Sequence, residues 1–275
     1  MKRCQIAGMN KHYRFYTIED FFLSLQKIGI HNVELWSCAA HYFFDYREFQ
    51  DPKPLLRKAS SYGIKIICFT PEQSNPRPYN LASREPELRE KTLNYYKNAI
   101  KVSCELECKR LVINGGWHFY SESFEDGWKR SVELLRQVVE FAQRNGVVLD
   151  LEPVSTAGPQ LIKRLTAVQR ILKEVNNPCL HVVADTTNLE MGGDSLQKYY
   201  EALGERLDHI HFVDGNPDGH LAWGDGTRDA SKLIALLDKY HYTGYLSLEI
   251  EGPQYLQQPI DADLSSMKAL EPFLQ

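Results

Sequence analysis

The chain has 275 residues, of which 25% are charged, and its formal net charge is -4 at pH 7. This balance and a pI near 6.2 argue against a nucleic-acid partner, which would favour clustered Lys and Arg. No run approaches the roughly 20 apolar residues of a membrane span, and the first residues lack the apolar region of a signal peptide. We therefore expect a cytoplasmic protein with no membrane partner, and its six dispersed cysteines to be reduced thiols.

Strand-like apolar segments alternate with helix-like segments along the chain. The first four pairs are 2–8 with 17–29, 32–37 with 54–63, 64–70 with 86–106, and 109–116 with 124–146. The last four pairs are 147–154 with 158–175, 180–187 with 195–204, 207–215 with 229–240, and 244–252 with 261–274. Eight such units predict an α/β fold, a (β/α)8 TIM barrel formed by a single domain over residues 1–275.

Local signals support these boundaries. Thr17 and Asp20 form the start signal of a helix, and glycines stand where three helices should end before a strand. The doubly wound open sheet is the rival fold, because it shows the same alternation. After the first strand, however, Gly8 stands without the further glycines of a dinucleotide-binding fingerprint. The barrel is therefore favoured.

The loops that follow strands differ from those that precede them. Short connections come before the strands, whereas segments such as 70–83 and 115–127 are long and rich in aromatic and polar residues. In a barrel, all loops that follow strands gather at the carboxyl face, where ligands bind. The sequence therefore predicts a site at that face.

Four polar side chains stand at the ends of four successive apolar strands. They are Glu152, Asp185, His211 and Glu249. Each one alone could simply reach water, but together in a barrel they converge, and their charges would repel without compensation. A divalent metal ion resolves this conflict, and oxygen and imidazole ligands suit Mn, Co, Mg, Ni, Fe or Zn. Nearby, Asp150 and His209 are expected to be supporting residues, and Glu251 is the alternative to Glu249.

Several motifs in order also carry a resemblance. They are "NVELW", "FTPEQSNPRPYN", "LDLEPV", "VVADTTN", "HIHFVDG", "WGDG" and "GYLSLEIEG". With them the chain resembles the xylose isomerase-like TIM barrels and, among these, the sugar 3-epimerases of the fructoselysine and psicose type. The resemblance implies that Glu152, Asp185, His211 and Glu249 bind one divalent metal ion, and that Glu152 and Glu249 also move the proton.

The reaction that the resemblance implies is C3 epimerisation of a ketose or conjugated ketosugar. The metal would stabilise an enediolate while one glutamate takes the proton and the other returns it. The substrate contacts depart from the family pattern: Asn188 replaces a common histidine, Gly158 replaces a common glutamate, and the segment 213–219 lacks a common arginine. The reaction class is therefore better defined than the sugar.

Six residues are predicted to contact the substrate. They are Glu34, Trp36, Glu72, His118, Asn188 and Trp223. Core packing is an equal alternative for Trp36, and Trp223 either closes the pocket or braces its own loop. Glu72 and His118 follow strands and could equally be solvated.

Other functions remain open at this point. An inosose-type dehydratase would use the same metal and a base but would expel water. An endonuclease IV-like metal hydrolase needs additional histidines and a basic surface, and neither is evident in the sequence. A non-catalytic sugar-binding barrel would have no need of the full ligand set. The resemblance further implies a homo-oligomer, a dimer or a tetramer.

Overall fold

Eight parallel strands close into a barrel in the order β1-β10-β7-β6-β5-β4-β3-β2. The computed structural model describes residues 1–74, 79–155 and 158–274, so part of the motif at 69–80 lies outside the described residues. The strands are β1 (Ile6–Met9), β2 (Asn32–Trp36), β3 (Lys65–Thr70), β4 (Arg110–Asn114), β5 (Val148–Glu152), β6 (Leu180–Asp185), β7 (Leu207–His211) and β10 (Tyr245–Leu248). The predicted TIM barrel is confirmed, because an open sheet would leave β1 and β10 unpaired, whereas here they pair in parallel.

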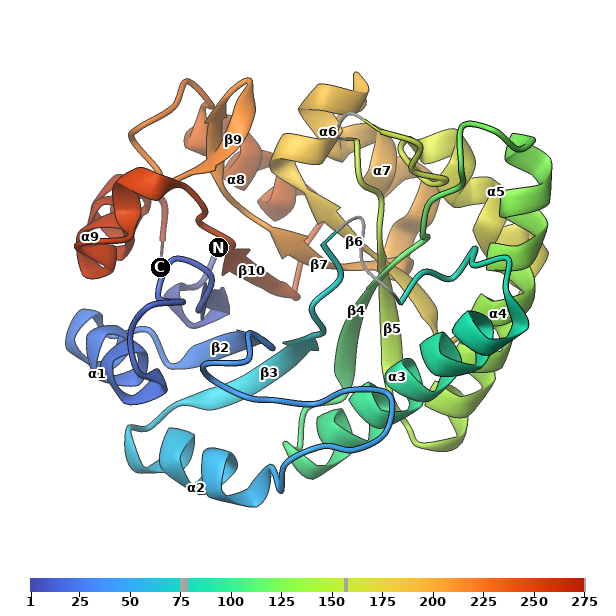
Figure 1. Ribbon diagram of the computed structural model, residues 1–275. Coiled ribbons are helices and arrows are strands. Elements are labelled where there is room, and N and C mark those ends of the chain that lie inside the picture. Colours follow the sequence, from blue (N-terminus) through green and yellow to red (C-terminus); the bar gives the residue numbers. More distant parts are fainter. Residues whose placement is uncertain (75–78, 156–157, 275) are drawn as a thin grey trace.

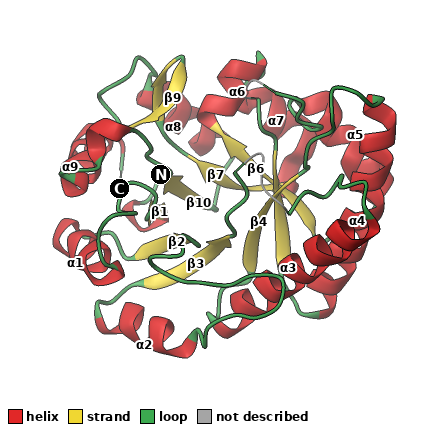
Figure 2. Ribbon diagram, viewed as in Figure 1, coloured by secondary structure: helices red, strands yellow, loops and turns green. Residues whose placement is uncertain are grey.

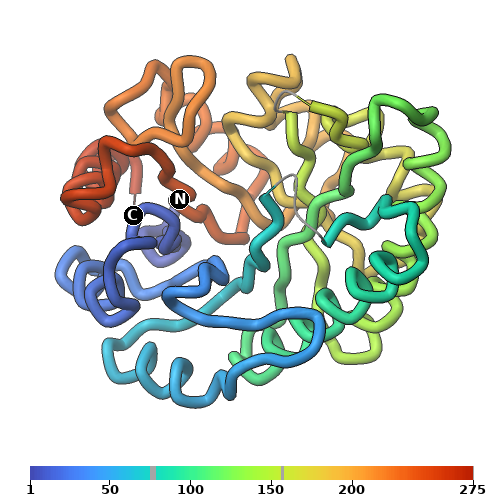
Figure 3. Tube along the Cα trace, in the orientation of Figure 1, coloured from blue at the N-terminus to red at the C-terminus, as the bar shows by residue number. Residues whose placement is uncertain are grey.

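Helices surround the barrel on the outside (Figures 1 and 2). They are α1 (Ile18–Ile28), α2 (Lys53–Ser61), α3 (Pro86–Glu105), α4 (Phe124–Arg144), α5 (Leu165–Val175), α6 (Thr186–Gly192), α7 (Leu196–Leu203), α8 (Ala230–Lys239) and α9 (Pro259–Leu270). The chain runs around the ring in sequence order, so that α9 comes back beside α1 (Figure 3). Within the described ranges, none of the helices has the length and apolarity needed to cross a membrane.

Helix α1 shows how the sequence sets its own boundaries. The Thr17 side chain accepts a hydrogen bond from the Asp20 amide, and the Asp20 carboxylate accepts one from the Thr17 amide, which satisfies two amides at the helix start. Gly29 ends the helix with φ of 75°, a conformation that glycine adopts at little cost. The helix buries its apolar face against the barrel through Phe21, Phe22 and Leu25.

The amino half of the barrel contains a compensated polar cluster. Arg110 on β4 donates to both oxygens of Asp150 on β5, at 2.9 and 2.8 Å. Arg110 also pairs with Asp208 on β7, which in turn contacts His181 Nδ1 at 2.8 Å. The guanidinium therefore compensates the buried Asp150 carboxylate, in agreement with the supporting role expected for this residue.

The structure departs from the predicted segments after β7 and after β5. The segment 207–215 was predicted as one strand, but β7 ends at His211, and an antiparallel hairpin follows, formed by β8 (Asp214–Asn216) and β9 (Asp218–Leu221). The helix predicted from 158 begins only at Leu165, because the preceding residues pair with the loop after β4. This pairing includes hydrogen bonds from Leu161 N to Gly116 O and from His118 N to Pro159 O, both 3.1 Å.

Candidate metal centre and substrate pocket

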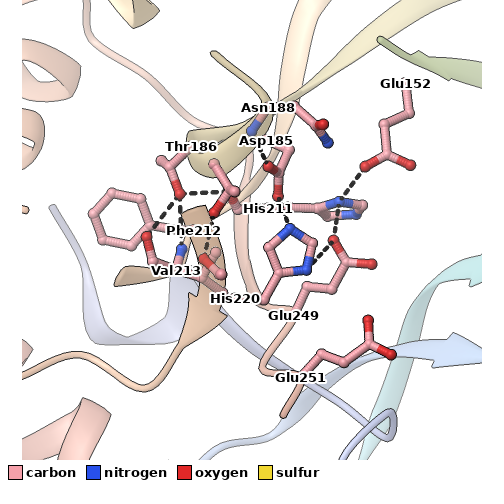
Figure 4. Close-up of polar contacts among 12 residues, drawn as sticks. Glu152, Asp185, Thr186, Asn188, His211, Phe212, Val213, His220, Glu249 and Glu251 are labelled. Atoms are coloured by element: carbon pink, nitrogen blue, oxygen red, sulfur yellow. Dashed lines mark hydrogen bonds and ion pairs between the residues drawn. The ribbon is translucent and has the colours of Figure 1, made fainter. Parts of the chain in front are cut away.

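The structure brings the four predicted ligands together at the carboxyl end of the barrel. Glu152, Asp185 and His211 end their strands, and Glu249 directly follows β10. One donor atom from each lies within 4.8 Å of the donor atoms of the others. His211 lies between the two glutamates, with Nδ1 3.2 Å from Glu152 Oε1 and 2.8 Å from Glu249 Oε2 (Figure 4). The four side chains therefore face one common point.

The donor set fits a single divalent cation. Asp185 is 1% exposed, Glu249 is 3% exposed and His211 is fully buried. Among the described residues, Asp185 Oδ2 and Glu249 Oε2 have ion-pair contacts with imidazoles, at 3.4 Å to His220 and 2.8 Å to His211, but no well-formed hydrogen bond, although a buried carboxylate oxygen normally has a donor. Three carboxylates and one imidazole are ligands that Mn, Fe, Co, Mg and Zn accept. A cation held among them would give both oxygens a directed partner.

Charge within the cluster shifts its pKa values in opposite directions. Burial would lower the pKa of His211, but Glu249 and Glu34 raise it well above its usual value. Burial and the charge of Glu249 raise the pKa of Glu152. Burial would also raise the pKa of Glu249, but His211 and Lys11 outweigh it and lower this pKa. A proton on His211 therefore competes with a metal ion for the same carboxylates, so metal binding should strengthen as the pH rises.

Glu34 lies behind His211 instead of facing the pocket. It is fully buried, and its Oε1 lies 3.0 Å from His211 Nε2 while its Oε2 lies 2.6 Å from His209 Nε2. Burial would raise the pKa of Glu34, but the two imidazoles hold it well below its usual range. With a proton on Nε2 donated to Glu34, His211 keeps the Nδ1 lone pair for the metal position. Glu34 therefore contacts His211, a proposed metal ligand, whereas the sequence predicted that Glu34 would contact the substrate.

His220 was not identified from the sequence. It lies on β9, with Nε2 3.4 Å from Asp185 Oδ2 and Nδ1 4.0 Å from Glu249 Oε2 (Figure 4). Burial would lower the pKa of His220, but Asp185 raises it to about 9. The hairpin is held over the site by the Thr187 hydroxyl, which donates to Gly219 O at 2.8 Å. The turn signal "NPDG" at 216–219 was the available indication of this hairpin.

Lys11 was also missed. It follows β1, and its Nζ lies 2.5 Å from Glu249 Oε1 and 3.6 Å from Glu251 Oε2. Glu251, the alternative to Glu249, belongs to the outer edge of the site, where it also meets Arg14 at 3.5 Å. No local pattern around Lys11 distinguishes it from a surface lysine, because its contact with Glu249 joins the first and last strands of the barrel.

A pocket of about 650 Å³ opens at the proposed metal centre, and Glu152 and Glu249 are among its lining residues. Of the six residues predicted to contact the substrate, Trp36 and Asn188 line this pocket. Glu72 lines a separate pocket of about 360 Å³. His118 and Trp223 lie outside the lining of the larger pocket.

Trp223 braces its loop. It is 2% exposed, and its Nε1 donates to Phe212 O at 3.0 Å. Its ring packs on that of Phe212, with the centroids 4.5 Å apart. Of the two alternatives for Trp223, these contacts favour bracing, because a buried indole whose N–H is already bonded has no polar group left for a sugar.

Residues 22–271 match the sequence model of the xylose isomerase-like TIM barrel family, so the chain belongs to this family. It is 27% identical over 258 residues to the fructoselysine 3-epimerase of Shigella flexneri, covering 93% of this chain and 92% of that protein. It is 26% identical over 175 residues to the D-psicose 3-epimerase of Ruminiclostridium cellulolyticum, covering 60% of this chain and 59% of that protein. The family resemblance predicted from the motifs is confirmed.

Solved structures show the same fold. A D-psicose 3-epimerase with D-tagatose from Clostridium cellulolyticum H10 superimposes with a TM-score of 0.76 at 18% identity, covering 98% of both chains. An AP endonuclease of family 2 from Brucella melitensis superimposes with a TM-score of 0.78 at 16% identity, covering 98% of this chain and 99% of the other. Because proteins with different names share this architecture, the fold alone does not assign the reaction.

Proposed function

We propose that the protein is a divalent-metal-dependent epimerase that inverts C3 of a ketose or a conjugated ketosugar. The main support is the convergence of four side chains, of which Glu152 and Glu249 line the pocket; the other two are Asp185 and His211. The relatives named 3-epimerases agree with an isomerase-class enzyme. The predictions of a single domain, a cytoplasmic location and a dimer or tetramer are part of this proposal.

Glu152 and Glu249 are the proton-transfer groups of the proposal. A bound dication supplies positive charge that stabilises the negative charge developing on the substrate oxygens when the proton leaves C3. The two glutamates approach from different sides of His211, whose Nδ1 contacts both. One carboxylate takes the proton on one face of the sugar, and the other returns a proton on the opposite face, which inverts the carbon.

The chain itself makes these two glutamates unequal. Glu249 faces the Lys11 ammonium at 2.5 Å, whereas Glu152, among the described residues, forms an ion pair with His211 alone. Against the effect of burial, His211 and Lys11 lower the pKa of Glu249, whereas burial and the charge of Glu249 raise the pKa of Glu152. Two carboxylates in unequal environments can serve as acceptor and donor in the same turnover.

The pocket has room for more than a free monosaccharide. Its volume of about 650 Å³ falls within the range of about 300–1,000 Å³ typical of sites for drug-sized ligands. Trp36 on its wall offers an aromatic face to a sugar ring, and Asn188 offers an amide. We therefore include ketosugars that carry an attached group among the substrates.

A dehydratase is the second candidate, and His220 is the observation that favours it. A protonated imidazole beside Asp185 in the pocket wall has the position and charge to donate a proton to a leaving hydroxyl. Such an enzyme would release water and form a product with new ultraviolet absorbance. An epimerase would leave the absorbance of the sugar unchanged.

The test is solvent exchange with the Mn²⁺-loaded protein in deuterated water. A library of ketoses and conjugated ketosugars should contain a sugar that takes up deuterium at one carbon without loss of water. Glu249→Gln should keep the fold and slow this labelling by about 10²- to 10⁴-fold, because it removes a proton-transfer group. Absence of labelling across the library, or normal labelling by Glu249→Gln, would refute the proposal.

A further inference from the structure

The two oxygens of Glu249 have different partners. Oε1 lies 2.5 Å from Lys11 Nζ, and Oε2 lies 2.8 Å from His211 Nδ1. Lys11 is 19% exposed in its side chain and lines the pocket. The Lys11 ammonium therefore contacts the proposed metal ligand Glu249 at Oε1 and not at Oε2.

The residues on either side of Lys11 hold it in this position. Before it, the Asn10 side chain donates to Trp36 O at 2.9 Å and accepts from Trp36 N at 2.7 Å, which ties the end of β1 to β2. After it, the Tyr13 hydroxyl donates to Asp263 on α9 at 2.8 Å. Asn10, Tyr13 and Asp263 are all buried. A lysine side chain is normally mobile, but here the backbone that carries it is fixed on both sides.

We propose that Lys11 is a positioning residue that occupies Oε1 of Glu249, so that Glu249 presents only Oε2 to the metal centre. This inference rests on the proposed function and deepens it. A carboxylate can bind a cation through one oxygen or through two. If Glu249 used both oxygens, it would fill a position that the substrate oxygens need.

The charges around Lys11 favour this role over the binding of an anionic substrate group. Its nearest polar partners are the carboxylates of Glu249 and Glu251, at 2.5 and 3.6 Å. Its positive charge is therefore already compensated within the pocket wall. A phosphate at this position would face two carboxylates at short range, which is unfavourable.

The test compares three variants of the full chain. Lys11→Met keeps the length of the side chain and removes its charge, while Lys11→Arg keeps the charge. Arg14→Met is the matched control, because Arg14 is a cation of the same loop that meets Glu251 at 3.5 Å and lies outside the pocket lining. Three quantities are measured: Mn²⁺ affinity by chelator competition, the number of exchangeable waters on bound Mn²⁺ by water-proton relaxation, and deuterium labelling of the substrate.

Lys11→Met should bind Mn²⁺ about tenfold more tightly, because a like charge near the cation is removed, and its bound Mn²⁺ should carry fewer exchangeable waters. Labelling should slow by about 100-fold, the usual effect of a misplaced reacting group. Lys11→Arg should restore the water count, and Arg14→Met should match the wild type. Weaker Mn²⁺ binding or an unchanged water count in Lys11→Met, at a wild-type free energy of unfolding, would overturn the inference.

Two of these readouts do not depend on turnover. If the wild type labels no sugar while the affinity and water count change as expected, the proposed function fails and the role of Lys11 stands. If labelling occurs and the Mn²⁺ readouts of Lys11→Met stay at wild-type values, the proposed function stands and the role of Lys11 fails. If Lys11→Met does not fold, a lower water count in Lys11→Arg than in the wild type would overturn the inference.

Discussion

Removing the charge of Glu34 should weaken metal binding although Glu34 faces away from the pocket. Its Oε1 accepts from His211 Nε2 at 3.0 Å in a fully buried environment. A hydrogen bond to a charged group contributes about 1.5–3 kcal/mol. Loss of such a partner of a ligating histidine typically costs about 10- to 100-fold in metal affinity, which corresponds to about 1.4–2.7 kcal/mol. The two estimates agree, so Glu34→Gln should bind Mn²⁺ about 10- to 100-fold more weakly.

The assay for Glu34→Gln is competition with a fluorescent chelator at constant pH, with Asp150→Asn as the matched control. Asp150 is also a fully buried carboxylate of the barrel, but it pairs with Arg110 and not with an imidazole. The control should lose stability and keep its Mn²⁺ affinity. An affinity of Glu34→Gln within twofold of the wild type, or an equal loss in Asp150→Asn, would refute the reasoning.

Three further predictions concern stability. Trp223→Phe should lower the free energy of unfolding by about 1–3 kcal/mol, because Phe212 O loses a buried donor. The substitution should leave KM unchanged. A raised KM would instead indicate that Trp223 contacts the substrate. Burial would raise the pKa of Asp208, but His181 and Arg110 lower it to about 2. Its stabilising contribution is therefore present above its unfolded pKa near 3.9 and is lost as the pH falls toward about 2, so Asp208→Asn should flatten the acid limb of a denaturation profile. The contact with Asp208 raises the pKa of His181. The contribution of His181 to folding stability is therefore present below about pH 6.5 and is lost as the pH rises through its folded-state pKa. His181→Asn should consequently destabilise the protein more at about pH 5 than at about pH 9.

The sequence was sufficient for the parts of the fold that depend on local pattern. The capping residues Thr17 and Asp20 and the terminal Gly29 define α1 through contacts within a few residues. The alternation of apolar strands and helices predicted all eight barrel strands, because each must bury one apolar segment. Glu152, Asp185 and His211 stand at strand ends, and the barrel geometry then requires their convergence.

The sequence was not sufficient for contacts that join distant segments. His220 reaches Asp185 because a hairpin folds back over the barrel, and Lys11 reaches Glu249 because β1 closes against β10. Glu34 follows the same principle, since its role depends on the imidazoles of His209 and His211, 175 and 177 residues away in sequence. Periodicity indicates which face of a strand a residue occupies, but it does not indicate which partner it meets across the barrel.

Metal stoichiometry tests the central claim most directly. After equilibrium dialysis against Mn²⁺ or Co²⁺, metal analysis of the wild-type protein should show one dication per chain. Asp185→Asn and His211→Asn should each bind it far more weakly while remaining folded by circular dichroism. A wild-type protein that retains no dication, or variants that bind it with wild-type affinity, would contradict a metal centre formed by Glu152, Asp185, His211 and Glu249.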